Sequence, residues 1–231
     1  MRSSANRSGL PNRVIRWSSA ISRALSLAGV IAGCLAFAAN SAWAQTPAGT
    51  DRVEEDWALL IRDTVPPQTA PQIVNVISPV DHIETDYAVL EMNHSTQPDY
   101  VDGGIQLQRW HGDFLRDFRA PTSHDVLSEA NEHITYTMSM KIENGNLVFG
   151  VLNGKSKTWG AFGGDADQWR TQTASSFADL SGYSPQTSTK YSRVGYGANY
   201  VQSYTLKETR YYKAGQLIKT DQTDFHVYLA Q

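Results

Sequence analysis

The chain contains very little cysteine: Cys34 is the only one in 231 residues. It lies among the 44 residues that precede Gln45, so a chain cleaved at that point would contain none. Such a chain could form no disulfide bond and would have no thiolate nucleophile or cysteine-based zinc site.

The first 44 residues also lack any acidic residue. They contain five arginines, an apolar stretch over 24–39, and the small-residue ending Ala42-Trp43-Ala44. This order is typical of a secretory signal peptide, and we expect cleavage after Ala44 and a secreted or periplasmic product. The apolar stretch is shorter than the roughly 20 residues of a membrane span. Alternatively, Ile31-Ala32-Gly33-Cys34 resembles a bacterial lipobox and predicts a lipoprotein anchored at Cys34.

Positive charge is scarce once this leader is removed. The full chain has 20 basic and 23 acidic residues, and five of the basic ones lie in the leader. The remainder is strongly acidic, which argues against nucleic acid or an anionic membrane as a partner. Its length suffices for one core without covalent cross-links. We expect a flexible lead-in over 45–55 and a single domain over 56–231.

No long amphipathic helix is evident, and period-two patterning dominates instead. Between residues 133 and 142, apolar and polar residues alternate without interruption. Asn144-Gly145 then predicts a tight hairpin, with a return strand over 147–153. This phase predicts that Met138→Asp disrupts the fold, whereas Thr137→Asp on the polar face is tolerated.

The remaining strand candidates are short and separated by turn-forming residues. A weak helical pattern covers 123–131. We therefore predict an all-β fold, a two-sheet antiparallel β-sandwich of the jelly-roll kind. The other expected strands cover 57–62, 73–77, 86–93, 105–110, 114–118, 192–196, 200–212, 217–220 and 224–229.

Two stretches resemble concanavalin A-like and laminin-G-like sandwich domains. The first is 134–162, with its alternating strand, Asn-Gly hairpin and Trp-Gly-containing strand. The second is Val194-Gly195-Tyr196-Gly197, which leads into the strand over 200–212. The resemblance is architectural and has no diagnostic motif. It implies a jelly roll that binds glycans or proteins.

Three tryptophans occur in polar surroundings, whereas Trp57 alternates with apolar residues. Trp110 shares its predicted strand face with Gln106 and Gln108. By the same period, Trp159 falls with two lysines and Trp169 with Asp165 and Asp167. An aromatic ring beside polar groups suits a sugar, because the ring stacks on a pyranose while the polar groups bind its hydroxyls. The alternative for each ring is structural packing.

Catalytic and metal-binding patterns are weak. Glu84 and Asp86 begin a glucanase-like carboxylate series, but Glu91 has the wrong parity and points to the opposite face. Asp165 and Asp167 follow a glycine pair as in the start of a Ca²⁺ loop, but the further acids are missing. We therefore predict no catalytic residue, no metal and no cofactor.

These observations favour a non-catalytic module that binds a polysaccharide or cell-surface glycan, with Trp110, Gln106, Gln108, Trp159 and Trp169 as ligand-binding residues. One alternative is a secreted glycan-cleaving hydrolase or lyase, whose acids and bases come together from separate strands. The other is a structural envelope or surface protein, whose outward tryptophans contact protein partners. The positions of the three rings and of paired carboxylates distinguish these hypotheses.

Overall fold

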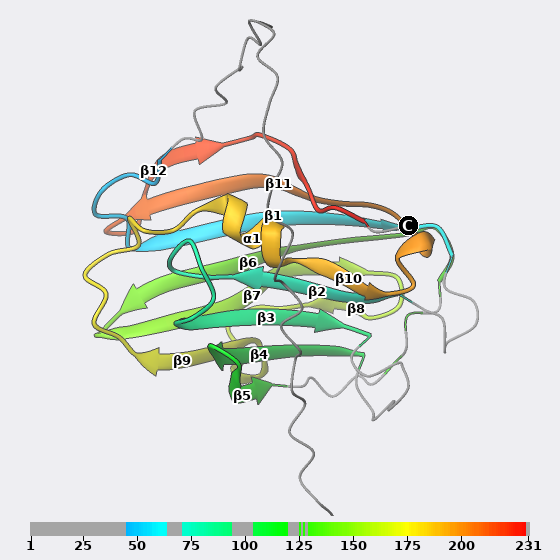
Figure 1. The fold of residues 1–231 in the computed structure, drawn as a ribbon, viewed down its shortest axis with the longest axis horizontal. Coiled ribbons are helices and arrows are strands. Elements are labelled where there is room, and N and C mark those ends of the chain that lie inside the picture. The colour runs from blue at the N-terminus through cyan, green and yellow to red at the C-terminus, as the bar shows by residue number, and fades with distance from the viewer. Residues whose placement is uncertain are drawn as a thin grey trace, which may run out of the picture. The chain divides into compact units, whose positions relative to one another are not determined.

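The computed structural model describes residues 45–63, 71–93, 104–119, 125, 127 and 129–229. Within these residues the chain forms two antiparallel β-sheets, a short helix α1 (Pro185–Tyr191), and the 3₁₀ turns η2 (Asp167–Trp169) and η3 (Ala198–Tyr200) (Figure 1). The predicted all-β, two-sheet fold is confirmed. The predicted leader and its two processing alternatives lie outside the described residues, as does part of the weak helical pattern over 123–131.

The larger sheet has eight strands, and its centre combines segments that are distant in the sequence. Its main path runs β12-β11-β1-β6-β7-β8, while β13 pairs with β11 and β9 pairs with β7. The strands are β1 (Arg52–Ile61), β6 (Glu132–Glu143), β7 (Asn146–Ser156), β8 (Gly160–Phe162), β9 (Arg170–Ala174), β11 (Val201–Lys213), β12 (Gln216–Asp221) and β13 (Phe225–His226).

The smaller sheet has five strands in the order β10-β2-β3-β4-β5, so four consecutive strands form a meander and β10 joins at its edge. Helix α1 packs against β2. The strands are β2 (Gln72–Ile77), β3 (Asp86–Met92), β4 (Ile105–His111), β5 (Phe114–Arg119) and β10 (Arg193–Tyr196).

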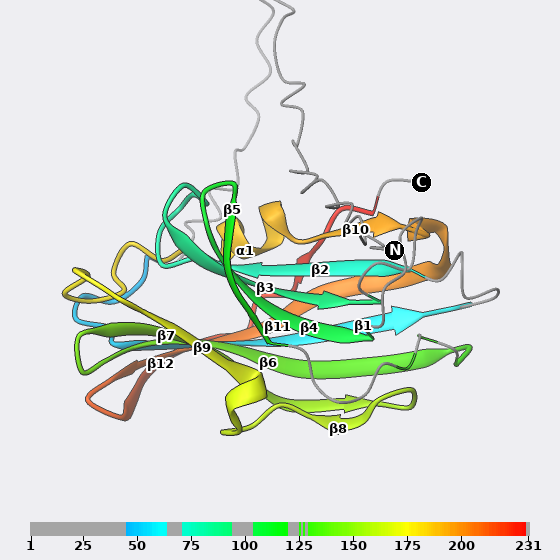
Figure 2. The ribbon, with the colours of Figure 1, turned by 90° about the horizontal axis from the view of Figure 1, so that it is seen from below.

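The main hydrophobic core lies between the two sheets, which face each other as two layers (Figure 2). Each strand contributes alternate residues, because successive side chains of a strand point to opposite faces. From β1 these are Val53, Trp57, Leu59 and Ile61, all at most 1% exposed. Leu90 of β3 and Leu107 of β4 contribute from the opposite sheet.

Strand β6 has the predicted phase. Ile134, Tyr136, Met138 and Met140 are buried in the core, and the alternate residues face away from it. However, Thr137 is only 3% exposed, because its hydroxyl donates to Asp56 Oδ1 at 2.6 Å. We therefore now expect Thr137→Asp to destabilise the protein, since it would place a second carboxylate against Asp56.

The segment 45–55, predicted to be a flexible lead-in, is held by strand pairing and by a side-chain hydrogen bond. Strand β1 begins at Arg52, five residues before the predicted start, and Thr50 is fully buried. The Thr46 hydroxyl donates to the Tyr183 carbonyl at 2.7 Å. The sequence obscured this start because Glu55, at an inward position of the strand, interrupts the apolar alternation.

Two elements differ from the sequence-based expectation for local reasons. Strand β9 was missed because Arg-Thr-Gln-Thr-Ala carries no large apolar residue. Helix α1 begins with Pro185 in its first turn, a favoured position, but seven residues are too few to show a helical period. No helix within the described ranges is long and apolar enough to cross a membrane.

Candidate functional site

The outer face of the eight-stranded sheet is interrupted by a β-bulge in β11. Asp56 of β1 pairs with Glu208, whereas the next residue, Trp57, pairs with Leu206, so Lys207 is the extra residue. A bulge bends its strand and redirects a side chain, and bulges are common beside functional sites. The Lys207 side chain is about half exposed on this face.

A second bulge occurs at the same level in β7. Thr137 of β6 pairs with Leu152 but Thr135 pairs with Lys155, so Asn153 and Gly154 together oppose one residue. Asn153 adopts a left-handed φ of 55°. Because Asp56 and Thr137 are themselves paired between β1 and β6, the two bulges flank the same central strand pair.

An open groove of about 780 Å³ lies between these bulges. We call it the outer groove. This volume is within the range of about 300–1,000 Å³ that is usual for ligand sites. Its lining is rich in polar side chains, namely Asp56, Thr135, Thr137, Asn153, Lys155, Lys207 and Arg210.

The floor of the outer groove is organised around Asp56. Arg210 donates from both terminal nitrogens to the two Asp56 oxygens, with Nη2–Oδ1 at 2.9 Å. Thr137 donates to Oδ1, and the Asn153 amide approaches the Thr137 hydroxyl at 3.4 Å. These bonds hold four side chains from four strands in fixed positions, an arrangement that can present donors and acceptors to a ligand without rearrangement.

The charge of Arg210 is neutralised by several acids. It also bonds Glu208 at 2.7 Å and Glu54 at 3.2 Å. The hydrogen bond to Asp56 is the largest cause that raises the pKa of Arg210 above its usual value, and the bond to Glu208 adds to it. Arg210 therefore stays charged, and its role in the outer groove is to orient Asp56.

A smaller hollow of about 100 Å³ adjoins the outer groove, and Gly164 borders both. Its cations are occupied: Lys141 and Arg170 both bind Glu143, and Arg52 stacks on the Tyr212 ring with its guanidinium carbon 3.7 Å from the ring centroid. The small hollow offers less room and fewer unengaged groups than the outer groove.

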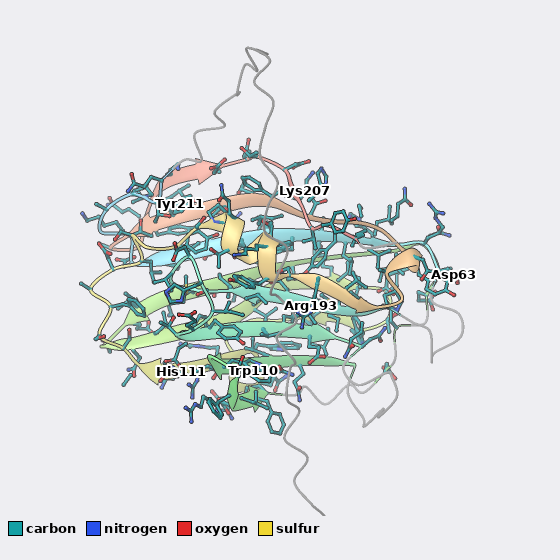
Figure 3. All side chains as sticks on the ribbon, in the orientation of Figure 1. Asp63, Trp110, His111, Arg193, Lys207 and Tyr211 are labelled. Carbon is teal, nitrogen blue, oxygen red and sulfur yellow. The ribbon has the colours of Figure 1, made fainter. Side chains whose placement is uncertain are left out.

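Trp110, Gln106 and Gln108 do share one face, as predicted, but that face is the outer side of the five-stranded sheet. There Trp110 packs against a small second cluster that includes Val76, Tyr87 and Val89. Trp110 Nε1 donates to Gln108 Oε1 at 2.7 Å. In Figure 3, Trp110 lies in the lower part of the view and Lys207 in the upper part.

The two glutamines are largely engaged within the protein. Gln108 Nε2 donates to Gln106 Oε1 and to Glu91 Oε2, both at 2.7 Å. Gln106 is 9% exposed and Gln108 4%. The amide groups that we expected to bind sugar hydroxyls are thus mostly used by neighbouring side chains.

Trp159 lies in the turn between β7 and β8, where strand alternation does not apply. Its Nε1 donates to the Asp125 carbonyl at 2.6 Å, and its ring packs against the main core. The buried Glu132 holds this turn by accepting from Lys157 N at 2.8 Å and Thr158 N at 3.0 Å. These contacts assign Trp159 a structural role in the turn.

Trp169 is not outward-facing, so its predicted grouping with Asp165 and Asp167 is wrong. It is 5% exposed, and its ring lies 5.7 Å from that of Phe162 in the core. The strand period failed because η2 (Asp167–Trp169) is a 3₁₀ turn rather than a strand. A ring this buried cannot present its face to a sugar.

We therefore expect Trp169→Ala to destabilise the protein by about 3–5 kcal/mol, the usual cost of truncating a buried aromatic ring. Urea unfolding of the variant and the wild type measures this difference. A variant with unchanged stability would contradict the assignment of Trp169 to the core.

The three tryptophans do not converge on one face, and the carboxylates do not form a catalytic pair in the outer groove. Asp56 is the single acid among its described lining residues. On β3, Glu91 points away from the core while Ala88, Leu90 and Met92 are fully buried on the Asp86 side, as predicted. Among the described residues no group of three potential metal ligands occurs.

A further ionisable group is sealed inside the protein. Glu55 is fully buried and accepts hydrogen bonds from Trp57 Nε1 at 2.9 Å, the Tyr183 hydroxyl at 2.5 Å and the Ser188 hydroxyl. Burial raises the pKa of Glu55 to about 7, although these hydrogen bonds partly oppose the rise. Its lack of exposure makes it a structural link between β1 and α1 rather than a ligand-binding group.

Sequence reasoning missed Asp56, Asn153, Lys207 and Arg210, although a signal was present for one of the two bulges. In β11, burial shifts from even positions at Tyr204 and Leu206 to an odd one at Tyr211, but Tyr212 continues the even series in the sequence, so only the structure reveals this shift. In β7, Asn153-Gly154 interrupts an apolar strand, as bulges often do. The Asn153-Gly154 pair was therefore the readable feature.

Comparison with known proteins yields no relative. The chain matches no protein-family profile, no curated protein and no solved structure.

Proposed function

We propose that this protein is a non-catalytic module that binds a polysaccharide or cell-surface glycan in the outer groove. The observation that carries the proposal is the pair of aligned bulges, which line one open groove with polar side chains from four strands. Hydroxyl, amide and carboxylate groups in fixed positions match the donors and acceptors of sugar hydroxyls.

The proposal keeps the ligand class expected from the sequence but moves the site to the other sheet. A grooved sheet face in a two-layer antiparallel fold also agrees with the proposed concanavalin A-like, jelly-roll relationship. We further propose export through cleavage after Ala44, which would bring the protein to extracellular or envelope glycans.

The hydrolase alternative has less support. Canonical glycoside hydrolysis uses two carboxylates on either side of the scissile bond. Among the described lining residues of the outer groove the single acid is Asp56, and its carboxylate already accepts hydrogen bonds from Arg210 and Thr137.

Protein binding, the other alternative, is favoured by one observation: Phe114, Leu115 and Phe118 of the edge strand β5 are 45–65% exposed.

The test first measures binding of the purified protein to a panel of soluble polysaccharides. Variants of the protein are then tested with the polysaccharide that binds best. Thr135→Leu should remove a hydroxyl from the floor of the outer groove and occupy part of its space, and so weaken binding by up to about tenfold. Asn153→Gly should also weaken binding, because it removes the amide side chain. Glycine adopts the left-handed φ of this position without strain, so the fold should be retained.

Trp110→Ala is the matched control on the opposite sheet, and its binding should equal that of the wild type. Melting temperatures of all variants separate binding from folding. If Trp110→Ala lost binding while Thr135→Leu retained it, the site would lie on the five-stranded sheet. If no polysaccharide bound, the proposed function would be rejected.

A further inference from the structure

The edge strand β5 of the five-stranded sheet combines a free backbone edge with large exposed apolar side chains. Within the described residues β5 pairs with β4 alone, and it forms the lower edge of this sheet in Figure 1. Its other side therefore offers backbone donors and acceptors that no other described strand uses. Phe114, Leu115 and Phe118 are each at least 45% exposed. Such an edge favours pairing with a further strand.

A bulge in β5 brings two of these side chains to one face. Leu115 pairs with Trp110 and Phe118 pairs with Gln108, so Arg116 is the extra residue. In a regular strand, residues three positions apart lie on opposite faces. The bulge instead places both apolar side chains on the outer face of the sheet. Because Trp110 packs against the small second cluster, an apolar surface continues from that cluster to the free edge.

The charged residues of β5 have both signs. Asp117 accepts a hydrogen bond from Thr171 of β9 at 2.8 Å and forms an ion pair with Arg119 at 3.1 Å, which together hold its carboxylate in place. Arg116 is exposed, and its guanidinium carbon lies 5.4 Å from the centroid of the Phe114 ring. A carboxylate has acceptor sites for more than two bonds, so Asp117 can still accept from a further cation.

The strand is complementary to a second copy of itself. Two β5 strands can pair antiparallel about a two-fold axis, with Leu115 of each copy opposite Phe118 of the other. Arg116 of each copy then lies opposite Asp117 of the other. A shift of one residue in either direction would oppose two copies of Arg116 or two copies of Asp117, and like charges directly opposite are destabilising. Since both strands carry the same bulge, the paired apolar side chains all lie on the outer face.

We propose that two copies of this protein form a dimer through β5, which joins their five-stranded sheets into one continuous sheet. Leu115 and Phe118 from both copies then cover one another beside the Trp110 rings. The charges that often protect a free edge here complement each other across the two-fold axis. This inference does not depend on the proposed glycan binding, because the outer groove lies on the eight-stranded sheet.

Sedimentation equilibrium of the full chain, from about 1 µM to about 300 µM, tests the proposal. We expect a reversible monomer–dimer equilibrium without larger species, because a two-fold interface is fully used when two copies meet. Leu115→Lys and Phe118→Lys should each weaken dimerisation about tenfold or more, since each substitution occurs twice in the interface. Both side chains are exposed in the single chain, so the melting temperature of the monomer should not change.

Leu217→Lys is the matched control. Leu217 is 53% exposed on β12, which is an edge strand of the other sheet. The variant therefore introduces the same charge at the same kind of position, and its dimerisation should equal that of the wild type.

Arg116→Asp and Asp117→Arg test which residues face each other. Each variant alone would oppose like charges across the two-fold axis, so each should dimerise more weakly than the wild type. A mixture of the two variants should form the heterodimer in preference, because an arginine then faces an aspartate at both positions. Native mass spectrometry distinguishes the heterodimer from the two homodimers by mass.

The proposal would be overturned by a chain that stays monomeric over the whole concentration range. A dimer that both Leu115→Lys and Phe118→Lys leave intact would also overturn it, and so would growth into open-ended assemblies. Loss of the dimer in Leu217→Lys would place the interface on β12 instead. Absence of any preference for the heterodimer would overturn the pairing of Arg116 with Asp117.

Discussion

Met138→Asp is expected to prevent folding of the protein. Met138 is fully buried in the main core at the centre of β6. A carboxylate there would lose its hydration without gaining a partner, at a cost of several kcal/mol. This is a large part of the roughly 5–15 kcal/mol that stabilises a typical domain. Circular dichroism and thermal melting measure the loss.

The matched control is Thr135→Asp in the same strand. Thr135 faces the outer groove and pairs with Lys155, so the new carboxylate would meet water and a cation. We expect its melting temperature to lie within a few degrees of the wild type. Equal melting temperatures for Met138→Asp and Thr135→Asp would show that the orientation of β6 is incorrect.

Glu55 is expected to make the protein less stable as pH rises from about 4.5 to about 7. Burial raises the pKa of Glu55 from 4.5 to about 7 in the folded state. Between these values the unfolded state has released the proton and the folded state retains it. The folded state thus binds more protons, and its free energy of unfolding falls with increasing pH. Below pH 4.5 the contribution of the neutral acid is fully present.

The expected change is about 3 kcal/mol, since one pKa unit corresponds to about 1.4 kcal/mol. Glu55→Gln cannot ionise and should lack this part of the pH dependence. It will be less stable at low pH, because its amide cannot accept all the bonds from Trp57, Tyr183 and Ser188.

Urea unfolding of both proteins at pH 4.5 and pH 8 provides the measurement. The stability advantage of the wild type over Glu55→Gln should shrink by about 3 kcal/mol over this interval. A constant difference would mean that the pKa of Glu55 is not raised by burial. Comparison with the variant removes the contribution of all other titrating groups.

The sequence alone determined the features that depend on neighbours along the chain. The alternation around Met138 identified the buried face of β6, because a side chain's face follows directly from its position in a strand. Asn144-Gly145 identified the hairpin, and both residues adopt positive φ, at 51° and 75°. The phase of Trp110 with Gln106 and Gln108 was predicted for the same reason.

Only the tertiary structure decided which faces meet and which face carries a groove. Trp169 became a core residue because a 3₁₀ turn, rather than a strand, precedes β9. Asp56, Asn153 and Lys207 lie far apart in the sequence, and they line one groove because the two bulged strands, β11 and β7, flank the β1–β6 pair at one level. Period-two patterning assigns each residue to a side of its own strand. The order of the strands in the sheet, which aligns the bulges, is set by packing and pairing between distant segments.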